Sequence, residues 1–122
     1  MPTIIVESGE LPEAVRRTFT KVVSRWLRGE GVNLNHVITI FQDLEPGAVF
    51  SGPFPLASSG PYALVRCRID ERRPENFRRG LCAQIVEALD QVVPPGRIFV
   101  QFEQVSPELH LTGAEVLQET RL

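Results

Sequence analysis

The sequence predicts an α+β fold in which two β-α-β units build one four-stranded mixed sheet with two helices on one face. Three observations predict it: a six-residue pattern occurs twice, an apolar stripe with helical spacing follows each copy, and a segment of strand length flanks each stripe on both sides. Residues 12–17 and 74–79 both read Pro-Glu-x-apolar-Arg-Arg. Such a repeat indicates two copies of one structural unit, in a chain whose 122 residues suit a single domain.

Each predicted helix begins at its proline and buries one stripe of apolar residues. These residues recur every four positions, which places them on one helix face. The stripes are Val15, Phe19, Val23 and Leu27 in the first copy and Phe77, Leu81, Ile85 and Leu89 in the second. A proline near the first turn costs little, because the N–H group that it lacks would have no partner there. Glycines follow the first helix, and Pro94-Pro95-Gly96 follows the second.

The predicted strands are residues 3–7, 37–44, 62–69 and 98–105. Right-handed crossovers make the two strands of each unit parallel. The units span about residues 2–50 and 62–105, so the domain covers residues 1–122 with a turn-rich connector at 45–61. From residue 106 onward we expect a loop, a short edge strand and a fraying tail.

Composition excludes several classes of protein. There are 13 Lys and Arg against 15 Asp and Glu, a net charge of −2 that disfavours nucleic acid as a partner. No apolar run approaches the roughly 18 residues of a membrane span, and the start of the chain lacks the pattern of a signal peptide. Two cysteines and two histidines provide neither a disulfide framework nor zinc-ligand spacing. We therefore expect a cytoplasmic protein with no membrane partner, no metal and no cofactor.

The first strand is apolar on both faces, with Ile4 and Val6 on one side and Ile5 on the other. Two helices cover only one face of a four-stranded sheet. An open apolar face in so small a chain favours self-association through the sheet.

Pro2 is the first candidate for chemistry. Initiator methionine is usually removed before a small residue, which would leave Pro2 as a secondary amine at the start of a strand. Apolar surroundings disfavour the charged form and lower the pKa of such an amine from its ordinary value of about 8. A neutral amine is suited to general-base catalysis. The alternative is that Met-Pro is merely a common beginning of protein chains and that Pro2 has no catalytic role.

Arg72 and Arg73 are the second candidate, because they precede the second helix. Two guanidinium groups beside the N–H groups of a helix start can bind a carboxylate. The alternative is a solvated turn. Phe50, in the connector, is a packing residue or part of a pocket wall.

Other polar residues favour structural interpretations. Arg66 and Arg68 share one face of a strand, and we expect Glu7 and Glu103 on other strands to pair with them.

Four further residues receive no catalytic role from the sequence. His36 and His110 are expected to be solvated or locally hydrogen-bonded, and neither has a recognisable nucleophile partner. Cys67 and Cys82 are expected to be inert apolar residues.

Pro2 at the start of a strand, two β-α-β units of about sixty residues, and a connector of Gly and Pro residues with Phe50 resemble the tautomerase superfamily. This superfamily includes 4-oxalocrotonate tautomerase and macrophage migration inhibitory factor. The likeness covers nearly the whole chain. Residues 41–52, 71–73 and 81–86 are locally most similar to cis-3-chloroacrylic acid dehalogenase.

The resemblance implies a homotrimer with sheets inside and helices outside. It implies that Pro2 is the catalytic base and that Arg73, with Arg72 less well matched, binds a substrate carboxylate. Phe50 and Gln101 are the other implied substrate-binding residues. The implied activity is a cofactor-free interconversion of the enol and keto forms of a 2-oxo acid.

The sequence also departs from the family patterns. Leu27, Asp70 and Thr112 stand where the dehalogenase has a His, a second Arg and a Glu, and Gln101 stands where a neighbouring subunit donates a Tyr. His36 stands where the decarboxylase members have an Asp. Two alternatives therefore stay open: a Pro2-dependent dehalogenase, hydratase or decarboxylase of a small three-carbon acid, or a non-catalytic trimeric binding protein.

Overall fold

A computed structural model describes residues 2–120 and contains the mixed sheet that the repeat predicts. The strands lie in the order β2-β1-β5-β6. Their bounds are β1 (Thr3–Ser8), β2 (Ile38–Asp43), β5 (Ala63–Asp70) and β6 (Ile98–Val105). β1 is parallel to β2 and β5 is parallel to β6, whereas the central pair β1 and β5 is antiparallel. Each parallel pair belongs to one copy of the repeat.

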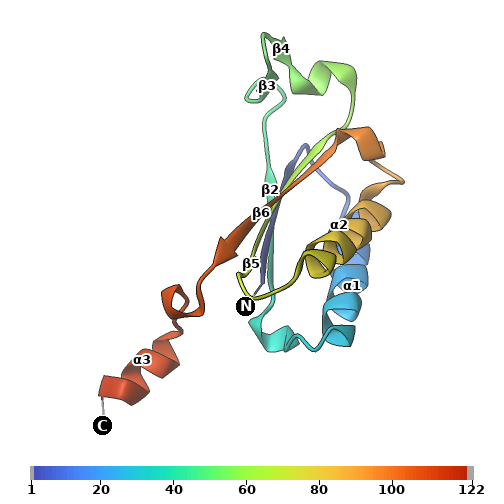
Figure 1. The fold of residues 1–122 in the computed structure, drawn as a ribbon. Coiled ribbons are helices and arrows are strands. Elements are labelled where there is room, and N and C mark those ends of the chain that lie inside the picture. The colour runs from blue at the N-terminus through green and yellow to red at the C-terminus, as the bar shows by residue number, and fades with distance from the viewer. Residues whose placement is uncertain (1, 121–122) are drawn as a thin grey trace.

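Helices α1 (Glu13–Gly29) and α2 (Glu75–Leu89) lie side by side over one face of this sheet (Figure 1). The predicted stripes form the buried face: Phe19, Leu27 and Ile85 are fully buried against strand residues such as Ile4 and Val6. Burial of each such side chain contributes about 1.5–3 kcal/mol relative to exposure, so the two stripes are the main source of packing energy between the layers.

The repeated prolines stand immediately before the helices. Pro12 precedes α1 and Pro74 precedes α2, and neither helix start has a side-chain cap. The Pro12 carbonyl accepts hydrogen bonds from the amides of Val15 and Arg16 at 3.0 and 3.1 Å. The Pro74 carbonyl accepts one from Phe77 at 3.0 Å. Each proline thus opens the first turn through its carbonyl group.

The two helices meet most closely where Trp26 of α1 lies over Gly80 of α2. A Cβ atom added at Gly80 would overlap the Trp26 ring. The same ring packs on Phe77, with centroids 5.3 Å apart. Gly80 is therefore the residue that lets the helices approach.

Gly80→Ala is expected to destabilise the fold by about 1–3 kcal/mol, because the added methyl group overpacks the contact with Trp26. This loss opposes the gain of about 1 kcal/mol that alanine usually brings to a helix. Chemical denaturation of the variant beside Gly29→Ala tests it, since no atom lies within 4 Å of a Cβ at Gly29. Equal stability of the two variants would contradict the packing argument.

The connector forms a small hairpin of β3 (Phe50–Ser51) and β4 (Phe54–Pro55), followed by the 3-10 turn η2 (Leu56–Ser59). Figure 1 shows this hairpin beyond one end of the main sheet, whereas the chain starts near the other end.

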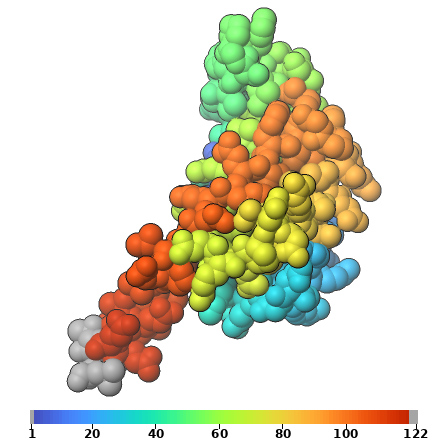
Figure 2. Space-filling model, in the orientation of Figure 1, coloured from blue at the N-terminus to red at the C-terminus, as the bar shows by residue number. Residues whose placement is uncertain are grey.

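The prediction of an edge strand after residue 106 is wrong. After β6 the chain forms the 3-10 turn η4 (Pro107–Leu109) and then helix α3 (Gly113–Thr120), which extends away from the body of the molecule (Figures 1 and 2). The Thr112 hydroxyl accepts a hydrogen bond from the Glu115 amide at 3.2 Å, as a helix N-cap does. The residues that follow are mostly good helix formers, so local propensity favours a helix.

No helix of residues 2–120 covers the other face of the sheet. Ile38, Ile40 and Phe99 lie on that face and are between 39% and 48% exposed. The open apolar face that the strand pattern predicted is therefore present in the single chain.

None of the helices in the described part of the chain is long and apolar enough to cross a membrane. Within residues 2–120, no three His, Cys, Asp or Glu side chains are grouped so that they could hold a metal ion.

Candidate functional site

A small cavity of 120 Å³ lies at the start of β1 and brings Pro2 and Arg73 together. Pro2 is buried, and its carbonyl oxygen accepts a hydrogen bond from the Ile38 amide at 3.1 Å. The lining includes Pro2, Val32, Asn33, His36, Asp70, Arg73 and Phe77. These residues come from the start of β1, the turn after α1, the end of β5 and the start of α2. Sequence-distant segments therefore meet because the central strands are antiparallel.

Arg73 is a half-buried cation with no carboxylate partner among residues 2–120. Its guanidinium donates to the Glu30 carbonyl at 3.5 Å and lies over the Phe77 ring, 4.8 Å from the centroid. Its backbone amide donates to the Asp70 carbonyl at 3.1 Å, which closes the turn into α2. Geometry and charge therefore leave this guanidinium able to bind an anion.

Arg72 has a different role from Arg73, although the two are adjacent. Its Nη2 lies 2.6 Å from Asp70 Oδ2, and its Nε donates to Asp70 Oδ1 at 3.0 Å. These hydrogen bonds lower the pKa of Asp70 from 3.8 to about 2. Arg72 does not line the Pro2 cavity, so the structure separates the two arginines that the sequence grouped.

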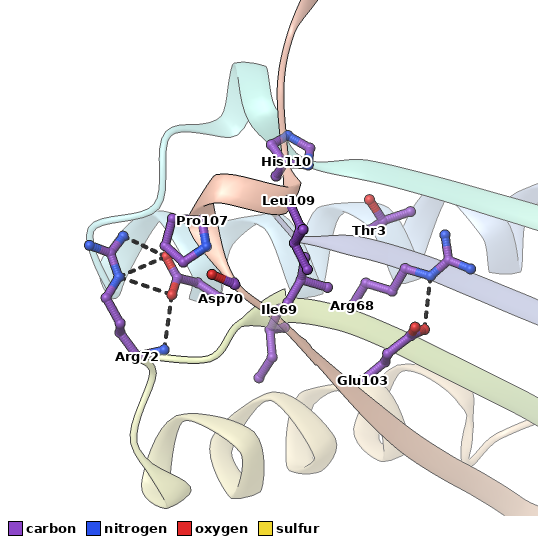
Figure 3. A pocket seen from close by; sticks show the side chains of 11 residues that line it. Thr3, Arg68, Ile69, Asp70, Arg72, Glu103, Pro107, Leu109 and His110 are labelled. Atoms are coloured by element: carbon purple, nitrogen blue, oxygen red, sulfur yellow. Dashed lines mark hydrogen bonds and ion pairs between the residues drawn. The ribbon is translucent and has the colours of Figure 1, made fainter.

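A larger cavity of 650 Å³ adjoins the first across Asp70, which lines both. Figure 3 shows the residues that line this larger cavity. Arg72 and His110 line it, together with Arg68, which pairs with Glu103 at 3.0 Å. His110 comes from the segment after η4, and its Nε2 atom is buried without a hydrogen-bond partner among residues 2–120. The expectation of a solvated or locally bonded His110 side chain is therefore wrong for that nitrogen.

The ion pairs expected on the open sheet face are confirmed. Arg66 lies 3.0 Å from Glu7, and Arg68 pairs with Glu103 across β5 and β6. Both arginines are therefore already neutralised by carboxylates of the same chain.

His36 and Asn33 also line the Pro2 cavity, although the sequence assigned neither residue to a site. His36 ends the 3-10 turn η1 (Leu34–His36), directly before β2. The Asn33 side chain accepts a hydrogen bond from the Asn35 amide at 3.0 Å and caps this turn. The Asn-x-Asn spacing is typical of such a turn and was the available sequence signal.

Comparison with known proteins identifies the fold. No family model matches the chain, and no curated protein does so. Three solved structures illustrate the likeness. N1, a member of the cis-3-chloroacrylic acid dehalogenase family, has a TM-score of 0.78 at 19% identity, with 98% of this chain and 92% of that chain covered. The macrophage migration inhibitory factor of Toxoplasma gondii has a TM-score of 0.72 at 19% identity, covering 91% of this chain and 96% of that one. A fused 4-oxalocrotonate tautomerase has a TM-score of 0.76 at 15% identity, with coverage of 91% and 92%.

The chain therefore has the fold of these solved structures. The similar structures include enzymes with different reactions, among them a malonate semialdehyde decarboxylase. At these identities the comparison establishes the fold, while the chemistry has to be argued from the site.

Two residues implied by the tautomerase resemblance lie away from Pro2 in the single chain. Phe50 is in the β3–β4 hairpin, beyond the opposite end of the sheet (Figure 1). Gln101 lies opposite Arg66 in the β5–β6 ladder, on the open face. Neither lines the Pro2 cavity.

Cys67 is unavailable for nucleophilic chemistry. It is buried in the core, and burial, followed by the nearby Cys82, raises the pKa of its thiol to about 12. The interpretation of Cys67 as an inert apolar residue is confirmed.

The Asp70–Arg72 pair predicts an acid-dependent loss of stability. The pKa of Asp70 is lower in the folded protein, about 2, than its ordinary 3.8. The stabilisation is therefore complete above 3.8 and is lost as the pH falls through about 2. Asp70→Asn should be less stable than the parent protein near neutral pH, and the difference should vanish at the acid end.

Denaturant unfolding at a series of pH values measures this difference. Glu75→Gln is the matched control, because Glu75 forms an exposed pair with Arg79 on the outside of α2. Its stability relative to the parent should vary little with pH. A constant difference between Asp70→Asn and the parent across the acid range would refute the assignment.

Proposed function

We propose that the protein is a cofactor-free tautomerase that interconverts the enol and keto forms of a 2-oxo acid. One observation carries the proposal: Pro2 and Arg73, whose guanidinium has no carboxylate partner among residues 2–120, line the same cavity. A proton transfer next to a carboxylate requires a base and a cation that binds the carboxylate in the same site.

Pro2 can act as a base only as the first residue, because an amide nitrogen has no basic lone pair. The proposal therefore requires removal of Met1, which lies outside the described residues. Pro2 is buried beside apolar Val32 and Phe77, and the Arg73 cation lies in the same cavity. Both features favour the neutral form of an amine, whereas the Asp70 carboxylate, which lines the same cavity, favours the charged form and is partly neutralised by its ion pair with Arg72.

The proposed reaction is a proton relay through one nitrogen. The Pro2 amine accepts the proton of the enol hydroxyl, and the O–H electrons move into the forming carbonyl group. The carbon–carbon π electrons then accept a proton from the prolyl ammonium at the neighbouring carbon. Arg73 binds the substrate carboxylate and stabilises the negative charge that passes through the enolate. No atom is gained or lost, and Pro2 ends in its starting state.

The Pro2 cavity is smaller than most ligand pockets, which measure about 300–1,000 Å³. Its 120 Å³ holds the reacting end of a substrate at most. We infer that a neighbouring copy of the chain completes the site in a homotrimer. The exposed Ile38, Ile40 and Phe99 offer the surface for assembly, and fused 4-oxalocrotonate tautomerases of this fold are described as asymmetric trimers. Phe50 or Gln101 of a neighbour could then reach the substrate.

A second candidate is a dehalogenase, hydratase or decarboxylase of a small three-carbon acid, with Pro2 as the acid. The similarity to dehalogenase-family member N1 and to a malonate semialdehyde decarboxylase favours it. A dehalogenase must activate a water molecule. Asp70 is the carboxylate of the Pro2 cavity, but it is bound to Arg72. The observed charges therefore favour tautomerisation.

Ketonisation of phenylenolpyruvate and of 2-hydroxymuconate, followed by ultraviolet absorbance, tests the function. The protein used must lack Met1, as shown by its intact mass. Pro2→Ala should lower kcat/KM by about 10²–10⁴-fold, the usual contribution of a general base. Arg73→Gln should lower it by about 10–100-fold, because a charged hydrogen bond to the carboxylate and to the developing enolate charge is lost.

Arg79→Gln is the control for loss of an arginine, since Arg79 is 80% exposed and pairs with Glu75 on the outer surface. It should retain the activity of the parent. Ketonisation at the buffer rate, or equal rates for the parent and Pro2→Ala, would overturn the proposal and redirect the assays to 3-haloacrylates and malonate semialdehyde.

A further inference from the structure

Asp70 is the one carboxylate among residues 2–120 that lines the Pro2 cavity. The other charged or titratable side chains of that lining are Arg73 and His36. A carboxylate beside an amine favours the ammonium form, which cannot act as a base. Asp70 is therefore the residue of the cavity whose charge opposes the proposed role of Pro2.

Arg72 engages both oxygens of this carboxylate, as Figure 3 shows. Its Nη2 donates to Asp70 Oδ2 at 2.6 Å, and its Nε donates to Oδ1 at 3.0 Å. Its backbone amide also donates to Oδ1, at 2.9 Å. All hydrogen bonds that the Asp70 side chain makes within residues 2–120 come from Arg72. Arg72 lines the larger cavity only, so a cation outside the Pro2 cavity holds the carboxylate.

The charges of Asp70 and of the start of the chain act on each other. The hydrogen bonds from Arg72 are the main cause that lowers the pKa of Asp70, and the positive charge at the start of the chain acts in the same direction. Such coupling is reciprocal, so an ionised Asp70 favours the charged form of an amine at the start of the chain. The Asp70 side chain is 20% exposed, and solvent therefore screens its charge only in part.

Without Arg72, the Asp70 carboxylate would have two other cationic partners in the Pro2 cavity. One is the ammonium group of protonated Pro2, and the other is the guanidinium of Arg73, which has no carboxylate partner among residues 2–120. The first pairing would stabilise the ammonium directly. The second would neutralise the cation that favours a neutral amine, and it would also occupy the group assigned to the substrate carboxylate. Both pairings would weaken the base.

We propose that Arg72 is a positioning residue: it holds Asp70 away from Pro2 and Arg73, so that the amine stays neutral and the Arg73 guanidinium stays available to a substrate carboxylate. The inference rests on the proposed function, because it takes Pro2 to be a free amine. It gives Arg72 a role other than the substrate binding that the tautomerase resemblance implied.

The midpoint of the Pro2 titration tests this role, measured by ¹⁵N NMR on proline-labelled protein whose intact mass shows that Met1 is absent. Arg72→Gln should raise the midpoint by about 0.5–1 pH unit, because the released carboxylate favours the ammonium form. The backbone amide of residue 72 still donates to Asp70 in this variant, which limits the shift. The acid limb of the kcat/KM profile for ketonisation should move to higher pH by the same amount.

A double-mutant cycle separates positioning from the charge of Arg72 itself. In an Asp70→Asn background, Arg72→Gln should raise the midpoint by much less, because no carboxylate is left to release. Arg79→Gln is the matched control for the loss of an arginine, since Arg79 pairs with Glu75 on the outer surface of α2. It should leave the Pro2 midpoint unchanged.

Equal rises in the two backgrounds would overturn the proposal, because Arg72 would then act only as a distant positive charge. A midpoint for Arg72→Gln that equals that of the parent would overturn it as well. The Arg72 side chain is 73% exposed, so the variant is expected to keep the fold, and its amide spectrum checks this. The titration needs no turnover, and its failure is therefore distinct from failure of the ketonisation assay that tests the proposed function.

Discussion

The antiparallel pairing of β1 with β5 is the contact on which the arrangement of the chain depends. In this register Thr3 lies opposite Arg68, and Ser8 lies opposite Ala63. The start of β1 therefore adjoins the end of β5, from which the chain turns into α2, and Arg73 is carried to Pro2. By the same geometry the start of β5 adjoins the end of β1, and the turn into α1 is carried to Tyr62. The pairing of these two central strands thus forms the Pro2 cavity at one end of the sheet and the cavity lined by Pro12, Tyr62 and Val93 at the other end.

The distribution of charge then makes the two ends of the sheet chemically different. Arg66, Arg68 and Arg72 each pair with a carboxylate of the same chain. These pairs determine which cations stay available for a ligand. The Arg73 guanidinium can bind an anionic ligand, because its partners are a carbonyl group and an aromatic ring, neither of which neutralises its charge. At the other end of the sheet, Arg97 is engaged by backbone carbonyls. The cavity lined by Pro61 and Tyr62 has Glu10 as its charged residue, and the Tyr62 hydroxyl is buried with no hydrogen-bond partner among residues 2–120.

Much of the fold could be predicted from the sequence, because both repeats carry helical stripes and strand-length apolar segments that agree with one topology. That topology also implies the meeting of Pro2 with the start of α2. The pairing of Arg72 rather than Arg73 with Asp70 could not be predicted, since it depends on the geometry of a single turn. The entry of His36 into the cavity depends on the 3-10 turn η1, whose residues show no clear periodicity. Helix α3 was missed because it is short, and its local signals were the Thr112–Glu115 cap and the helix-forming residues that follow it.

The claim that Pro2, which is buried and shares a cavity with the Arg73 cation, is a neutral amine can be tested directly by ¹⁵N NMR. Protein labelled at proline and freed of Met1 would be titrated beside a short peptide with the same first residues. The Pro2 nitrogen is expected to titrate at a lower pH than the peptide amine, and Arg73→Gln is expected to move the midpoint back toward the peptide. A Pro2 midpoint equal to or above that of the peptide would contradict the account of the site.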